Sequence, residues 1–181
     1  MSNPPISLYG SSYPVAKAAL EAATAFLHQA QAAPGADDLP HARLYENMSP
    51  LSTQVQYVCD IVRNLVNRTT GQDMGAAWAE DSSLSSLDDM HGRIAAAMKL
   101  VDAVDENTVN GKANETFTME TNRYGTVHVC VHTFVSTHVL PYLFFYLGMT
   151  YGILRKEGVP LQLMDYMGPF NNISINKPGA V

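Results

Sequence analysis

The sequence has little cysteine and little charge of either sign. Only two cysteines occur in 181 residues, Cys59 and Cys130, and they lie far apart in the sequence. This usage predicts a reduced protein whose two thiols pack as small hydrophobic groups, without a disulfide framework. Charged residues make up 15% of the chain, and the formal net charge is −6. The basic residues are scattered singly, and no run of them could follow a phosphate backbone, so we expect no nucleic-acid partner.

Long apolar runs are missing as well. No stretch reaches the roughly eighteen consecutive apolar residues that a membrane span needs. The most apolar segment, Val139 to Leu147, is short and is interrupted by Pro141. The N-terminal residues MSNPPISLYG lack the basic start and apolar run of a signal peptide. We therefore expect a cytoplasmic protein that does not contact membranes.

Apolar residues at helical spacing are what the sequence does contain. The composition is 46% hydrophobic, and the apolar positions recur at intervals of three and four, which is typical of helices packed around a core. The length fits one domain over residues 1–181. Helices are predicted over about residues 12–33, from Pro50 to just before Gly71, from about residue 83 onward, and from between Val127 and Phe134 to Glu157.

The segments between and around these helices carry further expectations. Ser11 or Ser12 is expected to cap the first helix, with Pro14 in its first turn. Residues 107–125 look irregular or briefly extended, and the short polar tail from about 170 to 181 is expected either to wrap the bundle or to remain loose. The fold prediction is an all-α, up-and-down four-helix bundle with a long, partly extended connection before the last helix.

Three stretches of the sequence look familiar when taken together. They are residues 41–51 continuing into Gln54-Val55-Gln56, residues 87–94, and residues 140–146 followed by segments 150–155, 158–161 and 165–168. This pattern resembles a branch of uncharacterised bacterial and fungal proteins in the DinB/YfiT-like four-helix-bundle superfamily. The resemblance implies a bundle that is often dimeric and has a pocket at one end.

The resemblance also implies chemistry, and the sequence departs from it at two positions. Many members of the superfamily hold a divalent metal through three His side chains, and they include thiol-dependent transferases, hydrolases and isomerases. The branch leads us to expect His where this chain has Tyr146, and Asn where it has His41.

One side of the last helix carries the strongest candidates for chemistry. His138, Tyr142 and Tyr146 follow one another at intervals of four, and Met149 continues the same side. If this side faces a pocket, the phenols and the imidazole can act as general acid and base. The alternative is a packed aromatic face whose hydroxyls reach solvent at one end of the bundle. We assign Tyr146, His138 and Tyr142 as candidate catalytic residues.

Five further residues are candidates for substrate binding. Gln54 lies on the buried stripe of the second helix, where its amide needs a neighbour, a water or a ligand. Met48 and Trp78 lie in predicted loops that either close over a pocket or plug one end of the bundle. The complete set is Gln54, His41, Met48, Trp78 and Met149.

A metal site is the alternative use of the histidines. His128 and His132 are four residues apart, so they would share one face of a helix, and they would also share a face of a strand. A third ligand would be His41, His138 or His91, and the spacing does not choose between them. The leading expectation is that no cofactor is bound, and the alternative is a divalent metal such as Zn or Ni.

These observations leave three hypotheses for function. The first is a cofactor-free isomerase, cyclase or dehydratase that acts on a largely apolar metabolite, of the kind found in secondary metabolism. The second is a non-catalytic small-molecule binding or interaction protein; the Ala-rich face of the first helix would then pack against a second copy in a homodimer. The third is a His-ligated metal enzyme. No nucleophile elbow, phosphate loop or dinucleotide fingerprint is present to suggest other chemistry.

Overall fold

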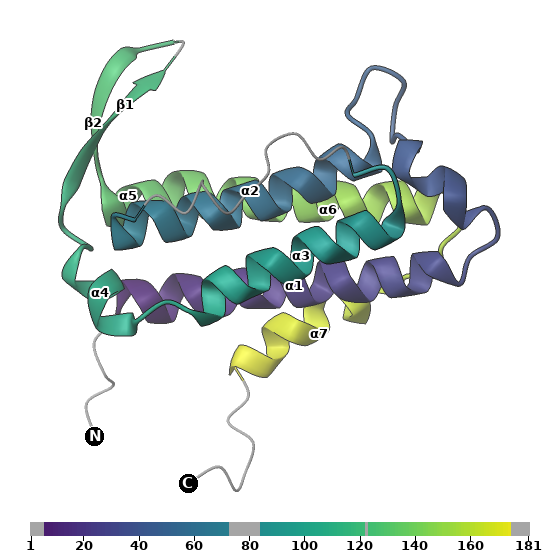
Figure 1. Ribbon diagram of the computed structural model, residues 1–181, viewed down its shortest axis with the longest axis horizontal. Helices are drawn as coiled ribbons and strands as arrows, with labels where there is room; N and C mark the ends of the chain where they lie inside the picture. The colour runs from purple at the N-terminus through teal and green to yellow at the C-terminus, as the bar shows by residue number, and fades with distance from the viewer. Residues whose placement is uncertain (1–5, 73–83, 122, 175–181) are drawn as a thin grey trace, which may run out of the picture.

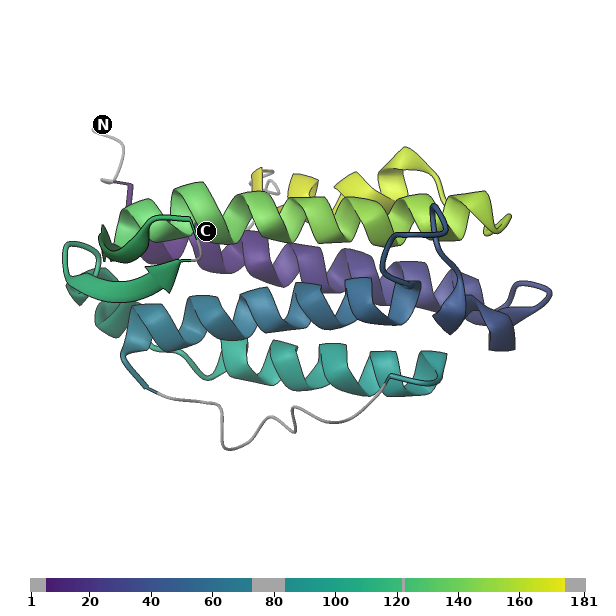
Figure 2. The same ribbon diagram turned by 90° about the horizontal axis from the view of Figure 1, so that it is seen from above.

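A computed structural model describes residues 6–72, 84–121 and 123–174 of the chain. The protein is mostly helical, and four long helices lie side by side along the longest axis of the molecule (Figures 1 and 2). Helix α1 packs against α3 and α6, and α2 packs against the same two neighbours. The four long helices are α1 (Leu8–Gln31), α2 (Leu51–Thr70), α3 (Leu87–Asp102) and α6 (Leu140–Lys156).

Helix α1 begins four residues earlier than the predicted start at Ser12. The cap is Ser7, whose side chain accepts a hydrogen bond from the backbone N–H of Gly10. The hydroxyl of Ser12 instead donates to the carbonyl of Leu8 at 2.6 Å, inside the helix. Pro14 therefore does not stand in the first turn, as predicted, but within the helix.

The ends of α2 and α3 are set by local chemistry that the sequence displays. Helix α2 begins after Pro50 and ends at Gly71, which adopts the left-handed conformation with φ of 72°. These are the predicted bounds. Helix α3 begins at Leu87 because Ser86 and Asp89 form a reciprocal capping box, in which each side chain bonds the other residue's backbone N–H.

The connections contain structure that the sequence analysis did not predict. A 3₁₀ helix, η1 (Ala36–His41), follows α1, and a six-residue helix, α4 (Glu106–Gly111), follows α3. The partly extended connection is an antiparallel hairpin of β1 (Thr116–Thr121) and β2 (Gly125–Cys130), in which Phe117 pairs with Val129. The all-α prediction is corrected accordingly: the protein is mostly helical with one small two-stranded sheet.

The last predicted helix is interrupted by a wider turn. It consists of α5 (Val131–Phe134), a π-helical turn η3 (Val135–Val139) and then α6. A further helix, α7 (Leu163–Ser174), packs against α1 and continues to residue 174, past the expected start of the tail at residue 170. Asp165 holds this helix in place, because it accepts hydrogen bonds from Gln29 Nε2 at 2.8 Å and from the backbone N–H of Gln162 at 2.6 Å.

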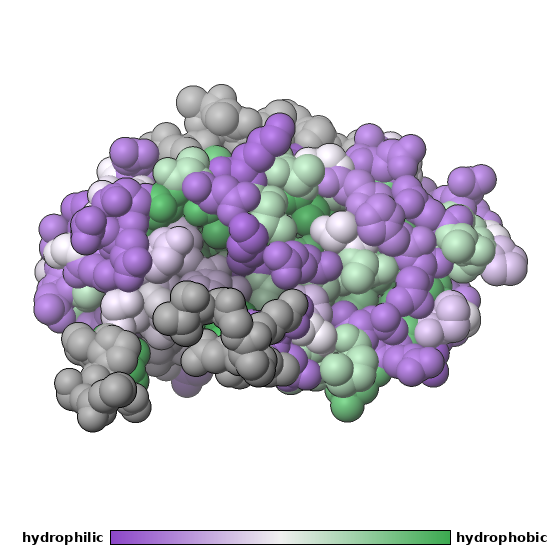
Figure 3. Space-filling view, turned by 90° about the horizontal axis from the view of Figure 1, so that it is seen from below, coloured by the Kyte–Doolittle hydropathy of each residue, from purple (hydrophilic) through white to green (hydrophobic). Residues whose placement is uncertain are grey.

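The small side chains of α1 pack in the core of the protein. Ala16, Ala19 and Ala23 have no exposed surface, so the Ala-rich face cannot meet a second copy, as the homodimer hypothesis supposed. Seen from the side on which α7 lies, the surface is a mosaic of hydrophobic patches and hydrophilic side chains (Figure 3). In the part of the chain that the structure describes, no helix combines the length and apolar character that crossing a bilayer requires.

Candidate functional site

Five aromatic side chains, from the consecutive elements α5, η3 and α6 and from the neighbouring helix α2, form a continuous row of ring contacts. We call this set the ring row. Centroid distances are 4.9 Å from Phe134 to His138, 4.6 Å from His138 to Tyr142 and 5.9 Å from Tyr142 to Tyr146. Tyr57 of α2 then lies 4.7 Å from Tyr146. The predicted catalytic residues are thus consecutive neighbours, with an unpredicted partner on α2.

The π turn helps to keep these rings in line. Side chains four residues apart in an α-helix step around its axis by about 40°, because one turn takes 3.6 residues. The wider turn at Val135–Val139 accommodates an extra residue and offsets that drift. His138 lies within this turn and stacks on Phe134 at an interplanar angle of 20°.

Phe134 is buried, at 5% exposure, whereas the other four members of the ring row are only partly covered. Tyr142 is 42% exposed and Tyr57 is 37% exposed, while His138 and Tyr146 are half-buried. Within the described residues, the hydroxyls of the three tyrosines make no hydrogen bond to protein. This arrangement is more like a packed aromatic face whose hydroxyls reach solvent, the alternative given in the sequence analysis, than like the wall of an enclosed pocket. The polar groups nevertheless remain available to a ligand.

Partial burial shifts the two titrating groups of the ring row in opposite directions. Desolvation lowers the pKa of His138, so the imidazole is neutral and able to accept a proton near pH 7. Desolvation raises the pKa of Tyr146, and the neighbouring phenols Tyr57 and Tyr142 add to this effect. Tyr146 therefore remains a protonated phenol that can donate.

The predicted substrate-binding residues lie in different places. Gln54 is 3% exposed; its Nε2 donates to the carbonyl of Ser49 at 3.0 Å, and its Oε1 has no hydrogen-bond partner. Met149 is half-buried on α6, one turn beyond Tyr146. Met48 is half-buried in the loop before α2, where its carbonyl accepts a hydrogen bond from Arg43 (Figure 2 shows this loop lying across α6).

The remaining two substrate-binding candidates do not join the ring row. His41 is exposed at the end of η1. Trp78 lies outside the described residues.

The two histidines predicted to share one face do not do so. His128 lies on β2 and its Nδ1 is 3.2 Å from the hydroxyl of Thr118, whereas His132 lies on α5 and its Nδ1 is 3.1 Å from Sγ of Cys130. The chain changes from strand to helix between them, so neither periodicity applies to the pair. His91, a possible third ligand, contacts His28 instead, at a centroid distance of 4.5 Å.

The residues present do not fit the three-imidazole metal site that the resemblance implies. Where that site would need a His, the ring row has Tyr146, and His138 is the row's only imidazole. Among the residues that the structure describes, no three His, Cys, Asp or Glu side chains are arranged to hold a metal ion. We derive no step through a metal.

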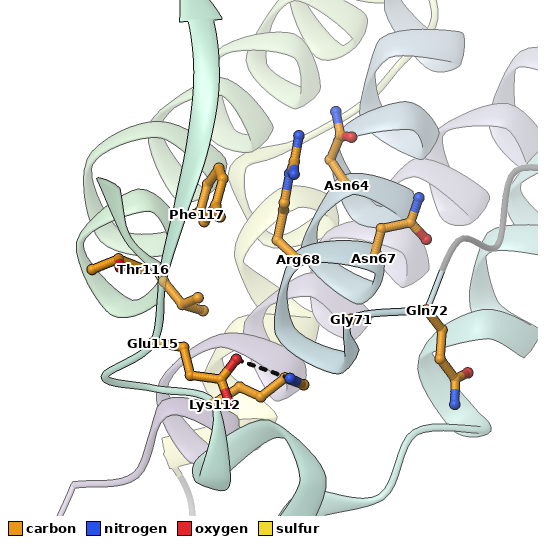
Figure 4. Close-up of a pocket in the computed structure, with 10 residues that line it drawn as sticks. Asn64, Asn67, Arg68, Gly71, Gln72, Lys112, Glu115, Thr116 and Phe117 are labelled. Atoms are coloured by element: carbon orange, nitrogen blue, oxygen red, sulfur yellow. Dashed lines mark hydrogen bonds and ion pairs between the residues drawn. The ribbon is translucent and has the colours of Figure 1, made fainter. Parts of the chain in front are cut away.

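A polar pocket lies where the ring row meets the hairpin, and the sequence analysis did not predict it. Its volume is about 450 Å³ (Figure 4). Phe117 of β1 links it to the ring row, with its ring centroid 5.2 Å from that of Phe134 in an edge-to-face arrangement. Arg68 of α2 stacks on Phe117, with its Cζ 4.5 Å from the ring centroid. The residues around the pocket are Asn64, Asn67, Arg68, Gly71, Gln72, Lys112, Glu115, Thr116, Phe117 and Val131.

The fold places the protein in the DinB-like superfamily of helical proteins. A crystal structure of a DinB family member protein from Shewanella denitrificans matches with a TM-score of 0.79 and 28% sequence identity. The match covers 89% of this chain and 92% of that chain. The chain belongs to the family described as "Domain of unknown function (DUF1993)", whose sequence model matches residues 8–167. No curated protein matches the chain.

Proposed function

We propose that the protein is a cofactor-free enzyme that moves a proton within a small, largely apolar metabolite bound along the ring row. The observation that carries the proposal is the contact row of Tyr57, Tyr146, Tyr142 and His138, whose polar atoms have no hydrogen-bond partner in the described part of the chain. Aromatic faces suit a planar apolar skeleton, and free phenol and imidazole groups suit its oxygen atoms and acidic C–H groups.

The proton transfer assigns one role to each shifted group. The neutral imidazole of His138 removes a proton from a carbon next to a carbonyl, and the electron pair moves toward the carbonyl oxygen. The phenol of Tyr146 donates a hydrogen bond or a proton to that oxygen. Return of the proton from His138 to a different carbon gives isomerisation. If the neighbouring carbon carries a hydroxyl group, that group takes the proton from His138 and leaves as water while the carbon–carbon double bond forms, which gives dehydration. Tyr142, which lies between the two, orients the ligand.

The architecture and assembly are part of the same proposal. We take the order of α1, α2, α3 and α6 to be that of an up-and-down four-helix bundle, and the working unit to be a cytoplasmic homodimer active in secondary metabolism. The dimer proposal is supported by large apolar side chains on the outer side of α6, where Phe144 is 40% exposed and Phe145 is 53% exposed.

Hydrogen–deuterium exchange tests the proposed chemistry without knowledge of the natural substrate. The probe is 2-tetralone, a bicyclic apolar ketone with acidic C–H groups, in D₂O followed by NMR. The wild-type protein should accelerate exchange above the buffer rate. General acid–base groups contribute about 10²–10⁴-fold, so His138→Gln and Tyr146→Phe should each remove most of the acceleration.

The control and the pH dependence sharpen this test. Tyr124→Phe removes a hydroxyl from a tyrosine that is 69% exposed on the hairpin turn, and it should leave the rate unchanged. The imidazole must be neutral to accept a proton, and the pKa of His138 is lowered. As the pH is decreased, the exchange rate should therefore stay constant until the pH passes below the ordinary histidine pKa near 6.5, and only then fall. A wild-type rate equal to that of buffer, or full rates in both variants, would rule out proton transfer at the ring row.

A non-catalytic binding protein is the second candidate. It is favoured by the openness of the ring row, since an exposed Tyr142 offers little exclusion of water. Saturable binding of 2-tetralone without accelerated exchange would support this candidate over the first.

A further inference from the structure

At its Phe134 end, the ring row is connected through Phe117 to the side chain of Arg68. Phe134 meets Phe117 of the hairpin, and the guanidinium of Arg68 lies over the Phe117 ring. A ligand lying along the ring row therefore reaches a cationic group at this end. The same end opens into the pocket of about 450 Å³ at the base of the hairpin.

The guanidinium of Arg68 contacts a ring and has no ion pair within residues 6–72, 84–121 and 123–174. Over these residues it lies against Phe117, and neither a hydrogen-bond acceptor nor a carboxylate pairs with it. An aromatic ring covers the flat face of a guanidinium and leaves the N–H groups at its edge available. The acidic residue that lines the pocket, Glu115, is already paired with Lys112 at 2.9 Å. Among the described residues that line the pocket, the charge left without an opposite partner is that of Arg68.

Asn64 adds a second free polar group beside the arginine. It stands one turn before Arg68 on α2, and the two side chains extend in the same direction next to Phe117 (Figure 4). No hydrogen bond joins Asn64 to any part of the chain that the structure describes. The fork of an arginine and a neighbouring amide together match the two oxygens of a carboxylate.

We propose that Arg68 and Asn64 bind a carboxylate of the ligand, so that the substrate is a planar aromatic or polyene acid with its carboxylate at the hairpin end of the ring row. This inference rests on the proposed function and adds the substrate class to it. The carboxylate group lies at Arg68, and the apolar skeleton extends past Phe117 and Phe134 toward His138 and Tyr146.

A matched pair of probes tests this inference. 2-Naphthoate and 2-naphthamide have the same ring system and differ in charge, and the binding of each to the full chain is measured by isothermal titration calorimetry. We expect the wild-type protein to bind naphthoate at least about fivefold more tightly, as a charge-assisted pair predicts. Arg68→Gln should abolish that preference, and Arg68→Lys should retain only part of it, because an ammonium lacks the planar fork.

Arg123→Gln is the matched control. Arg123 also stacks on an aromatic ring, with its Cζ 5.2 Å from the centroid of Tyr124, but it lies away from the ring row on the hairpin turn. This variant should keep the wild-type preference for naphthoate. Circular dichroism melts show that each variant is folded before its binding is compared.

The outcomes separate this inference from the proposal on which it rests. Equal binding of the two probes, with both weakened by His138→Ala, would overturn the carboxylate site and leave the ring row as a ligand site. An unchanged preference in Arg68→Gln would also overturn it. If neither probe showed saturable binding, the ring row itself would not hold a planar ligand, and both proposals would fall.

Discussion

A buried hydrogen bond between α1 and α2 allows a quantitative prediction about stability. The hydroxyls of Tyr13 and Thr69 are 2.7 Å apart, and the two residues are 1% and 0% exposed. The Thr69 hydroxyl also lies 2.7 Å from the carbonyl of Leu65. Thr69 can therefore donate to Leu65 and accept from Tyr13, so the two substitutions that break the pair are not equivalent.

The asymmetry follows from which group is left without a partner. Tyr13→Phe removes the donor, but Thr69 keeps its bond to Leu65, so the cost should be about 0.5–1.5 kcal/mol. Thr69→Val leaves the Tyr13 hydroxyl buried without an acceptor, which costs about 1–3 kcal/mol. In the double variant both groups are apolar, and its cost should be smaller than the sum of the two single costs.

Urea unfolding at 25 °C measures all three free energies of unfolding, with Tyr45→Phe as the control because Tyr45 is 62% exposed.

The pH dependence of the free energy of unfolding gives an independent check. Burial raises the pKa of Tyr13 from 10.0 to about 12, so the folded state holds this proton more tightly than the unfolded state. The resulting stability is complete below pH 10, is lost as the pH rises toward 12, and should be absent in Tyr13→Phe. If Thr69→Val cost no more than Tyr13→Phe, the reasoning would be refuted.

Two further predictions concern α7 and the dimer. Asp165→Ala removes the hydrogen-bond acceptor for Gln29 and for the backbone of Gln162. It should lower the free energy of unfolding by about 1 kcal/mol and speed proteolysis after residue 162. If α7 were as protected from protease in this variant as in the wild type, Asp165 would not anchor the helix. Phe145→Glu should shift a homodimer toward monomer in sedimentation equilibrium, whereas Tyr124→Glu on the hairpin should not. An unchanged dimer in Phe145→Glu would move the interface away from α6.

The end of a helix was predictable from the sequence where a single proline or glycine marks it and no neighbouring residue competes for the same role. Pro50 and Gly71 set the ends of α2 as the sequence indicated, because the first cannot continue a helix backward and the second adopts a positive φ. The start of α1 was less predictable because three serines, Ser7, Ser11 and Ser12, compete to cap it, and the outermost one does so. Helix α7 escaped prediction because it contains Gly168 and Pro169, two residues that usually mark the end of a helix.

The candidate site was predictable along one helix and not across two. The spacing of His138, Tyr142 and Tyr146 places them on one side of the last predicted helix, which became η3 and α6, without any tertiary information. Tyr57 could not be added, because its contact with Tyr146 depends on how α2 and α6 are aligned. Phe117 and Arg68 depend in addition on the path of the hairpin. The single signal available in the sequence was the recurrence of Tyr57, Asn64 and Arg68 at helical intervals along α2.

The π turn at Val135–Val139 sets the rotational position of the residues that follow it. If the same residues formed a uniform α-helix, the eight steps from Phe134 to Tyr142 would turn through roughly 800°, which places Tyr142 roughly 80° around the axis from Phe134. Tyr142 and Tyr146 would then lie progressively farther from the line of Phe134, although no side chain had changed its identity. A family member without the wider turn would keep the fold and the phenols yet lose the continuous contact between the rings.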